Sequence, residues 1–325
     1  MSKFVKRFAA CAAVLAVFAS PVAADYPEKP IRIIITGQPG GGVDIVARQI
    51  GQKLSESWGQ PVVIENRPGG GGSIAGQAVV RSDPNGYTLL LGAGTNMTVA
   101  PKLYKLGYDP VKDFMPVTEI ASAPYLVLVH PSVPVQTLPQ LIALIKEKKQ
   151  KKEEKFSFAT ASIGTPDHLS GELFKMMARV DMVHIPYKAA PLALIDLRGG
   201  HVPMAFATIP TALPHVKSRG VRALAITDSK RSKLLPDIPT VAETLPGYEM
   251  LTWYGIWTPA GTPAAVVDKI YREVKRIVNL LEVNALLRKD GFEPVVSTPA
   301  EFADFMKKET AKYGEIITAA GVRVN

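Results

Sequence analysis

The strongest constraint on the fold is a repeated pattern of a short apolar segment, a loop, and then residues with helical spacing. The first segment, residues 31–36, leads into a glycine-rich loop at 37–42 and a helical period over 43–57. Comparable apolar segments at 62–65 and 88–91 also end in loops rich in small and polar residues. This order is typical of β-α-β units with parallel strands, so we expect an α/β fold.

The same pattern starts again near Tyr125 and continues to about residue 226. Beyond Gly247 the sequence predicts one strand, a long helix over 263–281, and a second helix that opens with a Thr298-to-Glu301 capping box. These late helices have too few strands of their own, so we expect them to complete the first unit. Two crossings, near Ala123 and Glu249, then form a hinge. The predicted domains are 25–123 plus 250–325, and 124–249.

The N-terminal 24 residues have the composition of a secretory signal peptide. Three cations stand among the first seven residues, the segment 8–19 is apolar, and the small residues Val22 and Ala24 precede the expected cleavage after Ala24. The single cysteine of the chain, Cys11, lies in this segment. Its removal leaves no thiol, which excludes cysteine nucleophiles, thiolate metal sites and disulfides. We predict an exported protein with no later membrane span.

The charge pattern and the motifs of the sequence exclude several other classes of protein. The formal net charge of +9 falls to +6 when the three cations of the N-terminal 24 residues are left out, and this modest basic excess suits an anionic ligand. The densest basic segment, 146–155, mixes lysines with glutamates and holds no aromatic residue, so nucleic acid is not an expected partner. The five histidines never occur at metal-ligand spacing, and neither a phosphate-binding loop nor a dinucleotide fingerprint is present. We therefore expect no metal, no cofactor and no catalytic group.

Two loops have the features of an anion site. Residues Pro39, Gly40, Gly41 and Gly42 open directly into a helix, and Ser162 to Thr165 precede another helix in the second unit. Glycine lets the backbone approach a ligand closely, and the free N–H groups and dipole of a helix start favour negative charge. Either loop alone is more simply explained as a tight turn, but two such loops at equivalent places in the two units favour an anion site. Asp44 reads as a residue that stabilises the first helical turn and shapes the site.

Several motifs, in order, resemble the Bug family, the extracytoplasmic receptors of tripartite tricarboxylate transporters. The likeness covers essentially the whole chain after residue 24. The motifs are Tyr26 to Arg32, Pro39 to Asp44, Glu65 to Gly69, Asp83 to Leu90, Tyr108 to Phe114, His168 to Phe174, His184 to Lys188, Leu234 to Glu243 and Pro259 to Pro263.

The resemblance implies a two-domain periplasmic binding protein fold, type II-like, with a mostly parallel sheet flanked by helices in each domain. Members close over carboxylates, often with bridging water, and deliver them to a two-component membrane permease. It implies two ligand-binding segments that face each other across the cleft, one in each domain, called here the first and the second jaw. The first jaw consists of Pro39, Gly40, Gly41, Gly42 and Asp44, and the second of Ala161, Ser162, Gly164, Thr165 and His168. Neighbouring site residues are Thr95, Asn96, Tyr187, Lys188 and Ala207. A monomer in the periplasm is expected.

The sequence departs from the family at Gln38, Ala189, Ala190 and Ala207, where an aromatic residue, two glycines and an aspartate are usual. Because Ala207 removes an acid that would pair with an ammonium group, we expect a plain carboxylate ligand instead of an amino acid. Two alternatives stay open. In the first, the protein is a sensor, and its closed, ligand-bound form contacts a signalling protein instead of a permease. In the second, the protein is a hydrolase on the same architecture, with Ser73 or Ser162 as its nucleophile.

Overall fold

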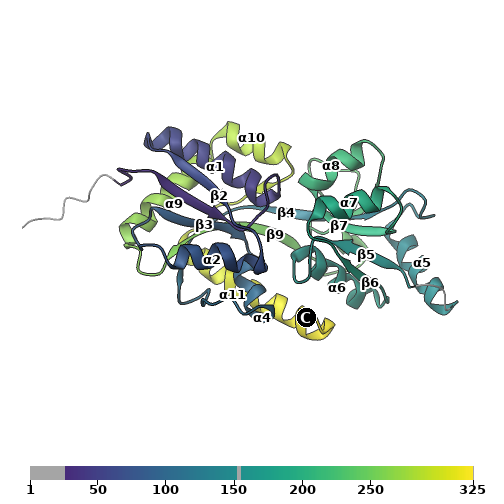
Figure 1. Cartoon of the computed structure of the whole chain (residues 1–325). Coiled ribbons are helices and arrows are strands. Elements are labelled where there is room, and N and C mark those ends of the chain that lie inside the picture. The colour runs from purple at the N-terminus through teal and green to yellow at the C-terminus, as the bar shows by residue number, and fades with distance from the viewer. Residues whose placement is uncertain (1–25, 152–154, 325) are drawn as a thin grey trace, which may run out of the picture.

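The computed structural model describes residues 26–151 and 155–324, which form two α/β domains joined side by side (Figure 1). The predicted signal peptide and its cleavage point lie outside the described residues. Within these residues, ten strands form one continuous hydrogen-bonded sheet. Within it, the first sheet has the order β2-β1-β3-β9-β4, and the second contains β8, β4, β7, β5 and β6.

The first sheet combines parallel and antiparallel strands. Its strands β1, β2 and β3 run parallel, whereas β9 pairs antiparallel with β3 and with β4, and β10 adds a short antiparallel pair. Strand β1 is almost wholly buried because helices cover both faces of the sheet. The strands are β1 Ile31–Ile35, β2 Val62–Asn66, β3 Thr88–Ala93, β4 Phe114–Val129, β9 Leu251–Pro259 and β10 Glu293–Pro294.

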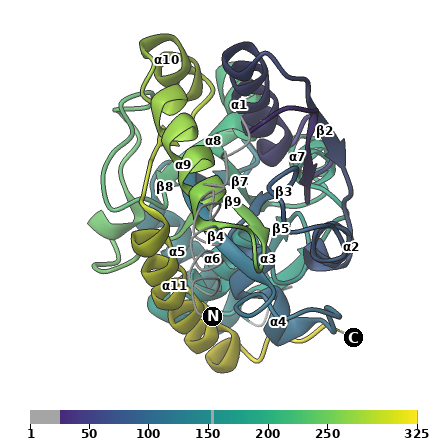
Figure 2. The ribbon, with the colours of Figure 1, turned by 90° about the vertical axis from the view of Figure 1, so that its left-hand side faces the viewer.

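Helices from both ends of the chain cover this sheet. One face packs with α1, α9 and α10 around residues such as Val46 and Ile270, and the other packs with α2 and α11 around Trp253 and Phe302. In Figure 2, α10, α9 and α11 follow one another from top to bottom in the left-hand part of the view, and α1 lies beside α10 at the top. The helices are α1 Gly42–Trp58, η1 Gly70–Gly72, α2 Ser73–Val80, α3 Thr95–Thr98, α4 Ala100–Leu103, α9 Ala264–Val278, α10 Leu281–Lys289 and α11 Pro299–Ala320.

The second sheet repeats the parallel arrangement. Strands β5, β6 and β7 run parallel, and the C-terminal part of β4 pairs antiparallel with β7 and β8. Its helices lie on both sides (Figure 1). The elements are α5 Leu138–Gln150, β5 Ser157–Thr160, α6 Pro166–Ala178, β6 Val183–Pro186, α7 Ala190–Arg198, β7 Met204–Thr208, α8 Ile209–Lys217, β8 Arg222–Ile226 and η2 Val241–Glu243.

Two antiparallel strands, β4 and β9, carry the chain between the domains. They are paired from Phe114 and Pro259 to Pro124 and Leu251, next to the point where β4 enters the second sheet. The predicted pair of crossings is therefore a two-stranded ribbon. The fold class predicted from the sequence is confirmed, while the exact residue boundaries of the domains stay a prediction.

The structure corrects two of the expected elements. The second series of the pattern, expected to start near Tyr125, begins within a 16-residue strand that starts at Phe114. The helix predicted over 263–281 is α9, which ends at Val278, and a separate helix that was not predicted, α10, begins at Leu281. The capping box of α11 is confirmed, because Thr298 and Glu301 exchange side-chain and backbone hydrogen bonds.

The second domain is also braced by segments from the first. Its main hydrophobic core contains Val99, at the junction of α3 and α4, and Tyr313, Ile316 and Ile317 of α11. Helix α11 contacts α6, and its C-terminal end lies below the junction of the two domains (Figure 1). The domains are thus in contact beside the hinge strands as well as through them.

The described part of the chain has neither a membrane-spanning helix nor a cluster of metal-binding side chains. No helix there combines the length and the apolar character needed to cross a bilayer. No group of three or more His, Cys, Asp or Glu side chains is arranged there to hold a metal ion.

Candidate ligand-binding site

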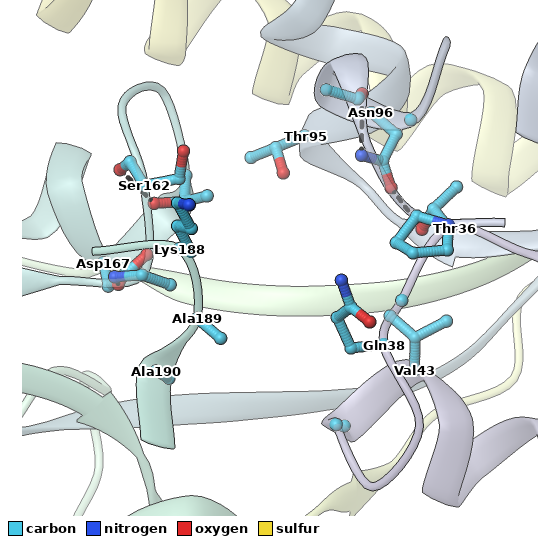
Figure 3. A pocket seen from close by; sticks show the side chains of 18 of the residues that line it. Thr36, Gln38, Val43, Thr95, Asn96, Ser162, Asp167, Lys188, Ala189 and Ala190 are labelled. Carbon is cyan, nitrogen blue, oxygen red and sulfur yellow. Dashed lines mark hydrogen bonds between the residues drawn. The ribbon is translucent and has the colours of Figure 1, made fainter. Parts of the chain in front are cut away.

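A cavity of about 720 Å³ lies between the two domains. Its walls are formed mainly by loops that follow the carboxyl ends of parallel strands and by the helix starts after them. This is where ligands bind in open α/β sheets. Residues from the two domains face each other across the cavity, with Gln38 and Thr36 on one side and Ser162, Lys188 and Ala189 on the other (Figure 3).

The first jaw is the loop between β1 and α1. The Gly40 N–H donates to Asp44 Oδ2, and the Gly41 N–H donates to the Gln38 carbonyl, so the loop is held by its own bonds. Helix α1 then starts at Gly42 without any side-chain cap. Its first N–H groups therefore remain as donors for a ligand.

Asp44 supports this loop from behind and is absent from the cavity lining of the described chain. Its carboxylate accepts hydrogen bonds from Gly40, Asn66 and Arg48, and it forms an ion pair with Arg48 at 2.9 Å. Burial alone would raise the pKa of Asp44, but the bonds from Arg48, Gly40 and Asn66 outweigh burial and lower it. The negative charge is thus engaged and does not repel an anion in the cavity.

The second jaw is the loop between β5 and α6. Thr165 Oγ1 donates to the Ser162 carbonyl at 2.7 Å, and the Gly164 N–H donates to His168 Nδ1. Helix α6 follows from Thr165 and again has no side-chain cap. The two jaws therefore repeat one construction: a loop closed by internal bonds and an uncapped helix start.

Asp167 is a cavity-lining residue that the sequence did not single out. Its Oδ2 accepts the Ala161 N–H at 2.5 Å, and the residue is only 3% exposed. Burial raises the pKa of its carboxyl, against the opposing effect of hydrogen bonds from Thr165 and Ala161. An acid in the first turn of a helix is ordinary in sequence, so no local signal indicated that it borders the cavity.

His168 lies behind the second jaw. Its ring stacks on His184 with centroids 3.8 Å apart, and His184 Nε2 is 2.5 Å from Thr160 Oγ1. Burial, followed by the nearby His168, lowers the pKa of His184 to about 3, so this ring is neutral at pH 7. The histidine pair orders the base of the loop and does not line the cavity in the described chain.

The structure separates the predicted site residues into two groups. Asp44, His168 and Tyr187 stand outside the lining, and the Tyr187 hydroxyl donates to Asp196 instead. Those that line the cavity are Pro39, Gly40, Gly41, Gly42, Thr95, Asn96, Ala161, Ser162, Gly164, Thr165, Lys188 and Ala207. Their contacts with a ligand stay a prediction. The four positions that depart from the family, Gln38, Ala189, Ala190 and Ala207, also lie at the cavity.

Further lining residues were missed by reasoning from the sequence. Tyr125 and Tyr254, on the hinge strands β4 and β9, both border the cavity. A Cβ at Gly42 would overlap the Tyr254 hydroxyl, so this tyrosine touches the first jaw. The remaining missed residues include Pro68 to Gly72, Tyr104, Thr208 and Thr211.

Helix starts dominate the electrostatics of the cavity. Besides α1 and α6, helices α7 and α8 begin there, after Ala189 and Thr208, and neither has a side-chain cap. The capping boxes of the described chain, at Thr137, Thr240 and Thr298, all lie away from the cavity. Helices α1, α6, α7 and α8, each of nine or more residues, thus begin at one space without a side-chain cap. Their first turns offer N–H groups there, except at the prolines of α6, α7 and α8, together with the cationic side chain of Lys188.

The geometry does not provide for nucleophilic catalysis at either serine. Within residues 26–151 and 155–324, no hydrogen bond joins the hydroxyl of Ser73 or Ser162 to a histidine. His168 instead accepts from the Gly164 backbone, and His184 pairs with Thr160. A serine without an adjacent base is a weak nucleophile.

Comparison with known proteins identifies the family of this chain. A family model described as "Tripartite tricarboxylate transporter family receptor" matches residues 46–322. Protein BugT of Bordetella pertussis is 32% identical over 313 residues, which is 94% of each chain. The solved structure of R. palustris Rpa4515 with adipate has a TM-score of 0.84 and 32% identity, covering 92% of this chain and 99% of that one. MatC from Rhodopseudomonas palustris with bound malate has a TM-score of 0.79 and 29% identity, covering 90% and 100%.

The matches cover nearly the full length of both chains and confirm the family that the sequence motifs indicated. They also confirm that this is a binding protein and not an enzyme. The chain belongs to the Bug family of tripartite tricarboxylate transporter receptors.

Proposed function

We propose that this chain captures a small organic carboxylate in the interdomain cavity and delivers it to a two-component membrane permease. The observation that carries the proposal is the set of four uncapped helix starts that meet at the cavity from both domains. The bound adipate and malate of the two structural relatives support a carboxylate ligand. We further propose export as a monomer to the periplasm, with cleavage after Ala24.

Binding would work by closure of the two domains on the ligand. One carboxylate oxygen would accept N–H groups from the start of α1, and the other would accept from the Ser162-to-Thr165 loop. A ligand that bridges both jaws binds the closed state better than the open state and so shifts the population toward closure. Closure then distinguishes the loaded receptor from the empty one for a permease.

The cavity favours an acid without an ammonium group. Asp167 and Lys188 are the charged side chains among the lining residues. The Asp167 carboxyl is engaged by the Ala161 N–H, and Ala207 offers no second acid. An ammonium group would therefore lose its hydration without gaining an ionic partner, which is costly in a buried site.

Isothermal titration calorimetry with mono-, di-, tri- and aromatic carboxylates, and with acidic amino acids, tests the proposal. We expect one carboxylate bound per chain and a clear preference over the matching amino acid. Tight amino-acid binding with no binding of di- or tricarboxylates would contradict the ligand class. Uptake of the best ligand into cells that carry the receptor and its permease, compared with cells that lack the receptor, tests delivery.

A matched pair of variants at Ala189 tests the electrostatic argument. Ala189 is the N-cap of α7 in an extended conformation and makes no side-chain cap. Asp and Asn both cap helices well, so Ala189→Asp and Ala189→Asn should fold equally well. Only Asp adds a negative charge at the cavity. We expect A189D to bind the carboxylate at least about tenfold more weakly than A189N, and equal affinities would contradict an anion site here.

A further inference from the structure

The glycine run 69–72 borders the cavity and is not explained by ligand contacts alone. All four residues have positive φ values between 56° and 114°. A Cβ at Gly71 would lie 2.8 Å from the Tyr104 ring, and a Cβ at Gly72 would lie 2.7 Å from Asn96 Nδ2. Both glycines are therefore required by space as well as by backbone conformation. The glycine run thus forms a surface against which the side chains of Asn96 and Tyr104 pack.

Asn96 connects this surface to the first jaw. Thr36, directly after β1, donates its Oγ1 hydrogen to Asn96 Oδ1 at 2.7 Å. Asn96 Nδ2 in turn donates to the Gly71 carbonyl at 2.9 Å. The end of β1, from which the first jaw extends, is thereby tied to the glycine run.

Tyr104 connects the same surface to the second jaw. Its ring packs on Gly71, and its hydroxyl donates to the Ile163 carbonyl at 3.2 Å. This bond joins a residue of the first domain, just after α4, to the middle of the Ser162-to-Thr165 loop. The neighbouring Gly164, with φ of 76°, packs directly against the Leu103 side chain.

We propose that Tyr104 is a positioning residue that holds the second jaw against the first domain before a ligand is bound. The chain of contacts runs from Thr36 through Asn96 and Gly71 to Tyr104 and Ile163, and it leaves the N–H groups of both jaws facing one space. The inference rests on the proposed function, because the Tyr104 bond sets the fraction of the empty receptor that is closed, and a bound ligand then raises that fraction.

This role has a distinctive thermodynamic consequence. A ligand that binds the closed state has an apparent Kd equal to its intrinsic Kd divided by the closed fraction. Loss of the Tyr104 bond lowers that fraction and so weakens every ligand by the same factor. A residue that touches the ligand changes affinities by factors that differ between ligands.

The variant Tyr104→Phe removes the hydroxyl and keeps the ring on Gly71. The matched control is Tyr26→Phe, because the Tyr26 hydroxyl also donates to a backbone carbonyl, that of Gly86, but within the first domain. Spin labels at Arg81→Cys on the first domain and Ile195→Cys on α7 of the second, both exposed positions, report the interdomain distance. The chain after Ala24 has no cysteine of its own, so these two are the only thiols.

Double electron–electron resonance on the ligand-free protein then gives the distance distribution. We expect Y104F to shift the ratio of the short-distance to the long-distance population about fivefold toward the long distance, which corresponds to one neutral hydrogen bond. The Y26F distribution should match that of the wild type. Identical distributions in Y104F and wild type, or the same shift in Y26F, would overturn the proposal.

Calorimetry with adipate and malate as probes separates this proposal from the proposed function. A uniform loss of affinity in Y104F for both probes supports the positioning role, whereas a loss confined to one probe would overturn it in favour of direct contact. If the wild type binds no carboxylate, the proposed function fails. The ligand-free distance measurement still decides the role of Tyr104 in that case.

Discussion

Gly42, the first residue of α1, allows a sharp test of how the first jaw is built. A Cβ at this position would overlap the Tyr254 hydroxyl and lie 3.2 Å from its Cζ atom. Tyr254 is 4% exposed, and its ring packs edge-on against Phe292 at 5.7 Å. The ring therefore has little freedom to move away, and Gly42→Ala must displace either the hinge strand or the jaw.

The expected cost follows from overpacking in a rigid site. Added methyl groups in well-packed regions cost about 1–3 kcal/mol, and the better helix propensity of Ala offsets part of this. We expect G42A to lower the free energy of unfolding by about 2 kcal/mol, measured by urea denaturation. Adding Tyr254→Phe removes the overlapping oxygen, and we expect it to recover about 1 kcal/mol in a double-mutant cycle.

The matched control is Gly314→Ala in α11. A Cβ there would meet the flexible end of Lys102 at 3.2 Å, so the same substitution should be tolerated or stabilising. If G42A unfolds at the wild-type urea concentration, the packing of Tyr254 on the first jaw is refuted. A cycle with no coupling between the two positions would likewise refute the assigned contact.

Burial and the nearby Glu309 raise the pKa of Glu119 to about 8, above its ordinary value of 4.5. Between these two pH values the folded state holds a proton on Glu119 that the unfolded state has lost, so the free energy of unfolding should fall as pH rises. Glu119→Gln cannot titrate, so its free energy of unfolding, measured in urea at pH 5 and pH 8.5, should fall less than that of the wild type. Parallel pH curves would contradict this. Lys188→Met should weaken a doubly charged ligand about three- to tenfold more than a singly charged one in low-salt calorimetry. Equal losses would exclude Lys188 as a charge partner.

The architecture and both jaws were predictable because their signals are local. Alternating strand, loop and helical periods specify the α/β order, and a glycine loop that opens into a helix indicates an anion site wherever the chain folds. The departures at Ala189 and Ala207 also pointed to the cavity. The family motifs, spread along the chain in a fixed order, predicted the two-domain binding fold.

The missed features depend on contacts between distant segments. Tyr125 and Tyr254 lie on apolar strands that look like ordinary core, and the pairing of β4 with β7 and with β9 brings them to the cavity. Tyr104 follows a four-residue helix with no motif, and its partner Ile163 is 59 residues away. The length of β4 was missed because its N-terminal part contains Pro116 and bulges that interrupt the strand pattern.

The most direct test of the central claim is a crystal structure of the mature chain with the carboxylate that binds most tightly in calorimetry. The account predicts one ligand in the 720 Å³ cavity, with carboxylate oxygens accepting backbone N–H groups from both the α1 start and the Ser162-to-Thr165 loop. A ligand held by one domain only, or bound outside this cavity, would contradict capture between two jaws.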